Sequence, residues 1–155
     1  MDTIKFIIED ITKEESDYRY RAVNIYINGE NLIDLVGRIE RITLASTNLS
    51  DSTEPSYVGL NVEWRLNLRE EFLGNTQQPF CVLLTCTCYE DECNSIIARI
   101  HMDSKTVTWS EFTSRLYGEE SRLWGGTPID YSGLGPFVFD RKQYMDALNA
   151  LEQSR

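Results

Sequence analysis

The run Pro79-Phe-Cys-Val-Leu-Leu-Thr-Cys-Thr-Cys-Tyr89 is the most apolar segment of the chain, and it predicts a buried strand. A second strand is expected over Cys93–His101, returning beside the first. A third follows over Thr106–Phe112, after the turn signal Asp103-Ser104-Lys105. The three segments predict an antiparallel meander at the centre of a sheet.

Alternating apolar and polar residues extend this sheet toward the N-terminus. Ile4, Phe6 and Ile8 predict a first strand with one buried face, and the β-rich segment 20–27 is its expected hairpin partner. Clean alternation over Tyr57–Leu68 predicts one long strand.

Two helices are expected beside the sheet. Asn28-Gly29 is a hairpin signal, but apolar residues at helical spacing follow it and predict an amphipathic helix over residues 30–41. Asp140 as N-cap, with Gln143 three residues on, predicts the start of a C-terminal helix. The expected fold is α+β: a single domain, 1–155, in which both helices pack on an antiparallel sheet of five or six strands.

Composition narrows the classes of function. The 155 residues include 25 Asp and Glu against 15 Lys and Arg, a net charge of −10. Such a field repels nucleic acid and anionic membranes and attracts a basic protein. The sequence shows no signal-peptide pattern and no apolar run of the ~20 residues that a membrane span needs, so a cytoplasmic protein is predicted.

No self-sufficient catalytic centre is visible in the sequence. The only histidine, His101, sits at the end of a predicted strand with no nucleophile motif near it. The glycines lack the strand-then-helix context of a phosphate-binding loop. Neighbouring carboxylates such as Glu70 and Glu71 point apart on a strand or turn, unlike a catalytic pair. We therefore expect neither an enzyme nor a cofactor.

The cysteine hairpin leaves three alternatives. Cys86, Cys88 and Cys93 together with His101 form an allowed zinc ligand set, although the usual C-x-x-C knuckle is missing. Cys88 and Cys93 could instead form a cross-strand disulfide, or all the thiols could simply fill a buried face. Core thiols are the favoured interpretation. A small-molecule-binding or zinc-stabilised domain built on this hairpin is the alternative function.

Two surfaces are candidates for contact with a partner. One is the acidic hairpin tip, which could steer a basic protein. The other is the aromatic loop within residues 113–136, unless its rings fold back to cap the sheet. The predicted partner-binding residues are Glu90, Asp91, Glu92, Tyr117, Trp124 and Tyr131.

Several segments together resemble a group of small uncharacterised bacterial proteins. The segments are Ile27–Val36, the Cys86-x-Cys88…Cys93 hairpin, Thr106–Phe112 and Leu134–Tyr144. Members of that group often carry a Gly/Cys-rich hairpin where this chain has Tyr89-Glu-Asp-Glu92. In charge, size and lack of catalytic motifs the chain also resembles the immunity proteins of bacterial polymorphic toxin and contact-dependent growth inhibition systems. That likeness implies a non-enzymatic inhibitor that covers a basic toxin domain.

Overall fold

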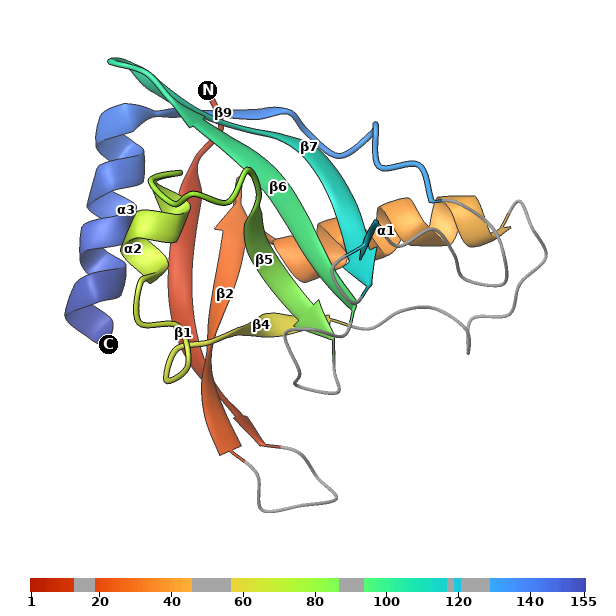
Figure 1. Cartoon of the computed structure of the whole chain (residues 1–155), viewed down its shortest axis with the longest axis horizontal. Helices are drawn as coiled ribbons and strands as arrows, with labels where there is room; N and C mark the ends of the chain where they lie inside the picture. The colour runs from red at the N-terminus through yellow and green to blue at the C-terminus, as the bar shows by residue number, and fades with distance from the viewer. Residues whose placement is uncertain (13–18, 46–56, 87–93, 117–118, 121–128) are drawn as a thin grey trace.

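The computed structural model describes residues 1–12, 19–45, 57–86, 94–116, 119–120 and 129–155 (Figure 1). Its strands are β1 (Ile4–Thr12), β2 (Arg19–Ile27), β3 (Glu30–Asn31), β4 (Tyr57–Asn61), β5 (Cys81–Cys86), β6 (Asn94–Met102), β7 (Thr106–Leu116), β8 (Glu119–Glu120) and β9 (Phe137–Asp140). Its helices are α1 (Leu32–Ala45), α2 (Leu68–Phe72) and α3 (Arg141–Ser154). None of these helices, within the described ranges, is long and apolar enough to cross a membrane.

The fold is α+β, with one antiparallel sheet in the order β1-β2-β4-β5-β6-β7-β8. Strand β3 pairs with β2, and β9 pairs with β7. The described residues thus form nine strands, and the prediction of five or six was too low. The unpredicted strands β3, β8 and β9 have only two to four residues, too few for alternation to be recognised.

The sheet curls until its two sides meet. Asp2 forms a parallel bridge with Phe139 of β9. The Asp2 N–H donates to the carbonyl oxygen of Val138 at 2.9 Å, and the Val138 N–H donates to the Asp2 carboxylate at 2.8 Å. The residues just before β1 are thereby joined to β9, which pairs with β7 toward the opposite end of the sheet.

The predicted central meander is confirmed. Strand β5 pairs with β6 from Cys81, opposite Ala98, and β6 pairs with β7 up to Met102, opposite Val107. The hairpin of β1 and β2 is confirmed too, since Ile4 lies opposite Ile27. By contrast, the long strand predicted over Tyr57–Leu68 is wrong in its second half, because β4 ends at Asn61 and a turn leads into α2.

The hairpin turn and the helix that the sequence indicates around Asn28-Gly29 are both present in the structure. The two residues have φ angles of 53° and 81°, as a two-residue hairpin turn requires, and Glu30 pairs with Ile27. The helix starts only after this short hairpin, because the side chain of Asn31 accepts the N–H of Ile33 at 2.9 Å. Helix α1 therefore begins two residues later than predicted, and it continues to Ala45.

Helix α3 starts at the predicted residue. The carboxylate of its N-cap, Asp140, accepts the N–H of Gln143 at 3.1 Å. The Gln143 side chain has a different role from the one in a capping box. Its amide accepts the N–H of Ile4 at 3.1 Å and donates to the Ile4 carbonyl at 2.7 Å. It thus bonds the edge of β1 as another strand would.

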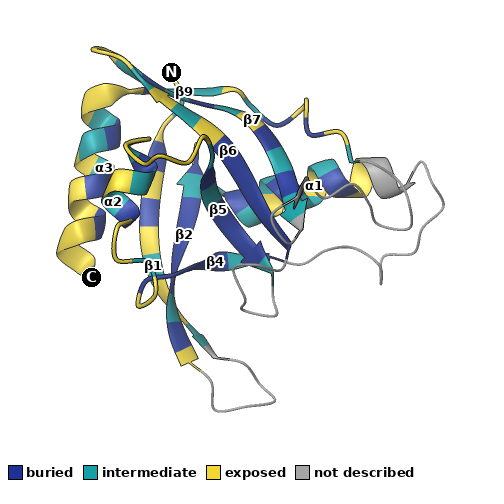
Figure 2. Cartoon of the chain, in the orientation of Figure 1, coloured by how far each residue is buried: buried dark blue, intermediate teal, exposed yellow. Residues whose placement is uncertain are grey.

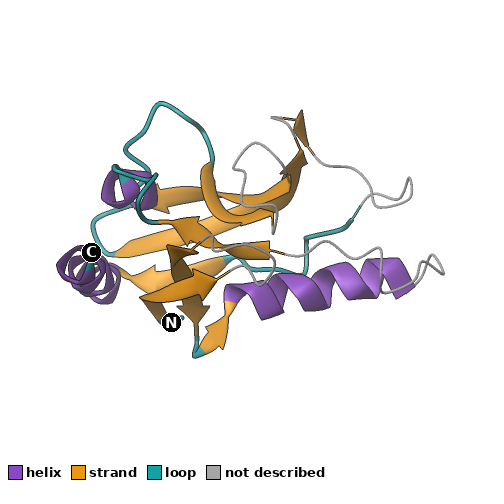
Figure 3. Cartoon of the chain, turned by 90° about the horizontal axis from the view of Figure 1, so that it is seen from below, coloured by secondary structure: helices purple, strands orange, loops and turns teal. Residues whose placement is uncertain are grey.

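An aromatic cluster fills the core between the sheet, α2 and α3. Phe6 stacks on Phe72 with ring centroids 4.8 Å apart, and Trp109 lies 6.2 Å from Phe72. The indole N–H of Trp109 donates to the Tyr144 hydroxyl at 3.1 Å. Figure 2 shows the buried faces of the strands and helices turned toward one another. Helices α2 and α3 lie together on one side of the molecule, away from α1 (Figures 1 and 3).

Candidate functional site

Strand β4 ends in a tight turn over residues 61–67. The side-chain oxygen of Asn61 accepts the N–H of Glu63 at 2.9 Å. Its backbone oxygen accepts the N–H groups of Trp64 and Arg65 at 3.3 and 3.2 Å. Asparagine favours this geometry because its short side chain reaches the backbone two residues on. Asn61 therefore stops the strand, and the alternating apolar residues that follow lie in a turn.

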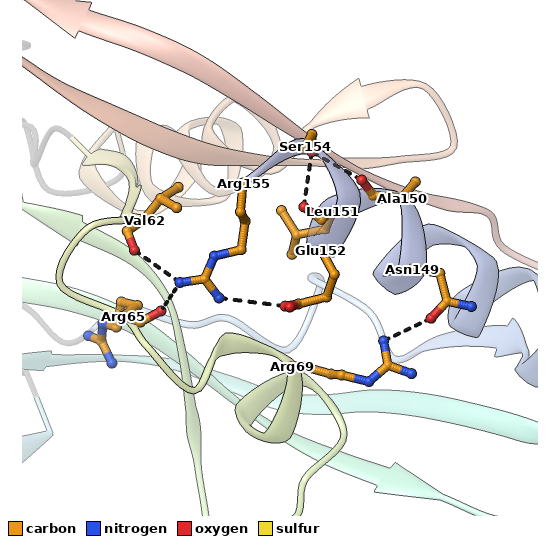
Figure 4. A network of polar contacts seen from close by, with 9 residues as sticks. All are labelled: Val62, Arg65, Arg69, Asn149, Ala150, Leu151, Glu152, Ser154 and Arg155. Carbon is orange, nitrogen blue, oxygen red and sulfur yellow. Dashed lines mark hydrogen bonds and ion pairs between the residues drawn. The ribbon is translucent and has the colours of Figure 1, made fainter.

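The end of α3 braces this turn from behind (Figure 4). The guanidinium of Arg155 donates to the carbonyl oxygens of Val62 at 3.2 Å and of Arg65 at 2.9 Å. It also pairs with the Glu152 carboxylate at 3.5 Å, and its side chain is 20% exposed. One rigid, charged donor thus holds two carbonyl groups of the turn in place.

Side-chain contacts also hold the second half of the turn and helix α2 in place. Arg65 pairs with Glu71 at 3.5 Å, with side chains 16% and 23% exposed. The Arg69 guanidinium donates to the side-chain oxygen of Asn149 at 2.9 Å, which joins α2 to α3 (Figure 4). The turn is therefore anchored both to α2 and to α3.

The braced turn presents two large apolar side chains to solvent. Trp64 is 55% exposed and Leu66 is 79% exposed, whereas Val62 and Leu68 on either side are buried. The other exposed large hydrophobic residues in the part of the chain that the structure describes are Met1, Ile7 and Ile42. Sequence analysis missed this pair because it placed both residues on the buried face of a strand; the turn-forming Asn61 is the signal that could have revealed it.

Such an arrangement is suited to binding. Tryptophan is enriched at the energetic centres of protein interfaces because it removes a large apolar area from water with few rotatable bonds. A turn that is already rigid loses little conformational entropy when it docks. We therefore regard Trp64 and Leu66 as a candidate protein-binding surface, called here the braced turn.

The residues predicted from sequence to bind a partner do not form one described surface. Tyr131 is buried, at 6% exposure, and belongs to the hydrophobic core rather than to an exposed face. The remaining predicted residues, Glu90, Asp91, Glu92, Tyr117 and Trp124, lie outside the described residues.

Tyr131 belongs to a buried polar group. Tyr57 and the Glu40 carboxylate lie beside it, and all three side chains are more than nine-tenths buried. Burial, and then the negative charge of Glu40, raises the pKa of the Tyr131 hydroxyl. Burial also raises the pKa of Tyr57, whose hydroxyl accepts a hydrogen bond from the amide of Asn94 at 3.1 Å. Both hydroxyls therefore stay protonated, and Tyr131 is held inside the fold.

The cysteines are described only in part. Cys81 is a buried free thiol, and burial raises its pKa, which keeps it protonated and unreactive. Cys88 and Cys93 lie outside the described ranges, so the zinc and disulfide alternatives stay predictions. Among the residues with described positions, no group of three or more His, Cys, Asp or Glu side chains could hold a metal ion.

Comparison with known proteins adds no family to this geometry. No family model matches the chain, and neither a curated protein nor a solved structure matches it.

Proposed function

We propose that this chain is a non-enzymatic protein-binding domain, and that it acts as an immunity or inhibitor protein against a basic bacterial toxin domain. The observation that carries the proposal is the exposure of Trp64 and Leu66, 55% and 79%, on a turn braced by Arg155. A large, partly exposed aromatic ring on a turn whose backbone is held in place is the kind of group that protein interfaces use as an anchor.

Charge selects the class of partner. The net charge of −10 favours a basic surface and would speed its approach at low ionic strength. In this proposal the acidic residues Glu90, Asp91 and Glu92 steer the partner, as their sequence suggests. Trp64 and Leu66 then supply the buried apolar contact. Steering acts on the association rate, whereas the apolar anchors act on the dissociation rate.

The first test is a differential pull-down from the native host. Wild-type protein, Trp64→Ala and the matched control Ile42→Ala serve as bait, since Ile42 is also exposed, at 69%, but lies in α1. The expected partner is basic, is retained by wild type and by Ile42→Ala, is lost with Trp64→Ala, and is released by high salt.

The captured protein is then purified and its affinity is measured by calorimetry. Removal of a tryptophan anchor is expected to cost ~2 kcal/mol or more of binding free energy, about thirtyfold in Kd. Co-expression completes the test: if the partner is a toxin, wild type restores growth and Trp64→Ala does so poorly. Equal binding of wild type and Trp64→Ala would exclude the braced turn as the anchor, and an acidic partner would exclude the charge argument.

A further inference from the structure

Two adjoining hollows lie between the connection from α2 to β5 and the strands β5, β6 and β7. Their volumes are about 180 Å³ and 150 Å³. The residues that line both hollows are Glu71, Thr76, Gln78, Phe80 and Cys81. Because so much of the lining is shared, the two hollows form one continuous depression, called here the double hollow.

The lining of the double hollow is basic, although the protein is acidic. Arg65, Arg99 and Arg115 contribute to it, and among the residues that the structure describes Glu71 is the only acidic one in the lining. The chain has only 15 Lys and Arg against 25 Asp and Glu, so this local excess of positive charge is opposite in sign to that of the whole molecule. His101 also lines the first hollow.

The positive charges are only partly compensated. Arg65 pairs with Glu71 within the double hollow. Arg99 pairs with Glu111 at 2.5 Å, but Glu111 does not line either hollow and is 61% exposed. Arg115 takes part in no ion pair in the described part of the chain.

One of these guanidinium groups is also held in position. The Arg99 guanidinium lies over the ring of Phe80, 5.4 Å from its centroid, a contact that restrains the group without using its N–H donors, of which the Nε–H pairs with Glu111. The side-chain amide of Gln78 adds a neutral donor to the lining. The described lining therefore offers more hydrogen-bond donors than carboxylates, and only a carboxylate would repel an anion.

We propose that the double hollow binds a small oxyanion, a phosphate or carboxylate group, with Arg99 and Arg115 as its principal donors. Planar guanidinium forks match the paired oxygens of these groups. The Cys81 thiol at the hollow is protonated, because burial raises its pKa, and so adds no negative charge. Together the two volumes reach only the lower end of the ~300–1,000 Å³ of sites for drug-sized ligands. The ligand is thus a free ion or the anionic end of a small molecule.

The proposal is tested by heteronuclear NMR titration of the purified protein with inorganic phosphate and, separately, with citrate. The buffer is low in salt and free of other oxyanions. Saturable shifts are expected for the backbone amides of Gln78, Arg99 and Arg115. Saturation with phosphate assigns the site to phosphate groups, and saturation with citrate alone assigns it to carboxylates.

Variants separate specific binding from a general response to ionic strength. Arg99→Gln and Arg115→Gln are each expected to weaken binding about tenfold or more. The control Arg38→Gln, whose side chain pairs with Glu30 and lines neither hollow, should bind like wild type. Thermal unfolding checks that each variant is folded. No saturable shift with either anion, or equal affinity in all the variants, would overturn the proposal.

The two sites adjoin, because Arg65 of the turn lines the double hollow, but the residues that carry the two proposals are different. Trp64→Ala should leave the anion titration unchanged, and Arg115→Gln should leave capture of the protein partner unchanged. Failure of one proposal is therefore distinguishable from failure of the other.

Discussion

Two tryptophans in similar sequence patterns have opposite environments. Trp109 and Trp64 each lie in a segment where apolar residues alternate with others, and both were expected to lie in strands. Trp109 is fully buried, whereas Trp64 is 55% exposed. On β7, Trp109 has a strand on each side, with Ile100 opposite it in β6 and Phe137 opposite it in β9. Trp64 lies in the turn that follows the end of β4, outside any strand.

The comparison shows that alternation alone does not bury a side chain. An apolar face is buried only where neighbouring strands continue the sheet and another layer covers it. Around Trp109 the covering layer consists of aromatic rings joined by hydrogen bonds. The Tyr144 hydroxyl accepts the indole N–H of Trp109 and donates to the carbonyl oxygen of Phe72. At Trp64 the fold supports the backbone and leaves the side chain 55% exposed. The first tryptophan is expected to act on stability and the second on binding.

The largest expected effect is that of Trp109→Ala. Removing this ring leaves a large cavity among aromatic side chains, so the free energy of unfolding should fall by about 3–5 kcal/mol. Trp64→Ala is the matched control, and its cost should be within about 0.5 kcal/mol because the side chain is exposed. Urea unfolding followed by circular dichroism measures both. Similar losses for the two variants would contradict the division of roles.

The Tyr144→Phe substitution tests the buried hydrogen bonds around Trp109. The change keeps the ring but leaves the Trp109 N–H and the Phe72 carbonyl oxygen without this partner, in a buried place. A loss of about 1–3 kcal/mol is expected in the same unfolding assay. The control is Tyr26→Phe, whose exposed hydroxyl bonds Glu9 at 3.2 Å; it should change stability far less. A Tyr144→Phe protein as stable as wild type would show that the buried bonds contribute little.

The Arg155→Ala substitution tests whether Arg155 holds the turn that carries Trp64. Two backbone carbonyl groups lose a charged donor, and because the site is partly exposed the expected cost is about 1 kcal/mol. Hydrogen exchange should accelerate at the amides of the turn, Glu63, Trp64 and Arg65 above all. The control Arg38→Ala, which removes a surface ion pair with Glu30, should leave exchange in the turn unchanged. Unaltered exchange in Arg155→Ala would mean that Asn61 alone holds the turn.

The smallest expected effect depends on pH and concerns the bridge between Asp2 and β9. Hydrogen bonds, first from the Asn28 side chain and then from the Val138 N–H, lower the Asp2 pKa below its usual 3.8. A carboxyl whose pKa is lower in the folded state stabilises the fold above its unfolded pKa, and this contribution is lost as pH falls through the folded value.

Asp2→Asn isolates this contribution from those of other carboxylates. Unfolding free energies of wild type and Asp2→Asn should differ most near neutral pH, and the difference should shrink well below pH 3.8. A difference that stays constant from neutral to acidic pH would show that Asp2 acts through its shape rather than its charge. The same variant leaves the braced turn untouched, so partner binding should not change.

Local sequence signals predicted much of the fold for identifiable reasons. The meander of β5, β6 and β7 and the hairpin of β1 and β2 follow from alternation and short turns. The start of α3 follows from the side chain of Asp140, which needs only the N–H three residues later. Asn28 and Gly29 each adopt a positive φ, which the short polar side chain of asparagine and the missing Cβ of glycine allow. In each of these places the decisive contact joins residues that are near in sequence.

Sequence reasoning failed where a residue's partner is distant. Nothing near Gln143 indicates that its amide would bond the backbone of Ile4, which lies 139 residues earlier. The same holds for Asp2 and Val138, which are 136 residues apart. The sequence left open whether Tyr131 contacts a partner or folds back to cap the sheet, and the fold places it beside Glu40 and Tyr57 in the interior.

The sequence by itself determined the class of the fold, its central strands, the start of α3 and the acidic charge that favours a basic partner. All of these depend on composition or on contacts within a few residues. The tertiary structure alone decided which apolar residues stay in water. Trp64 and Leu66 are exposed because Asn61 ends β4, and they are held because Arg155 reaches the carbonyl of Val62, 93 residues away in the chain. A contact at that separation depends on how the whole sheet and α3 pack, which no local pattern encodes.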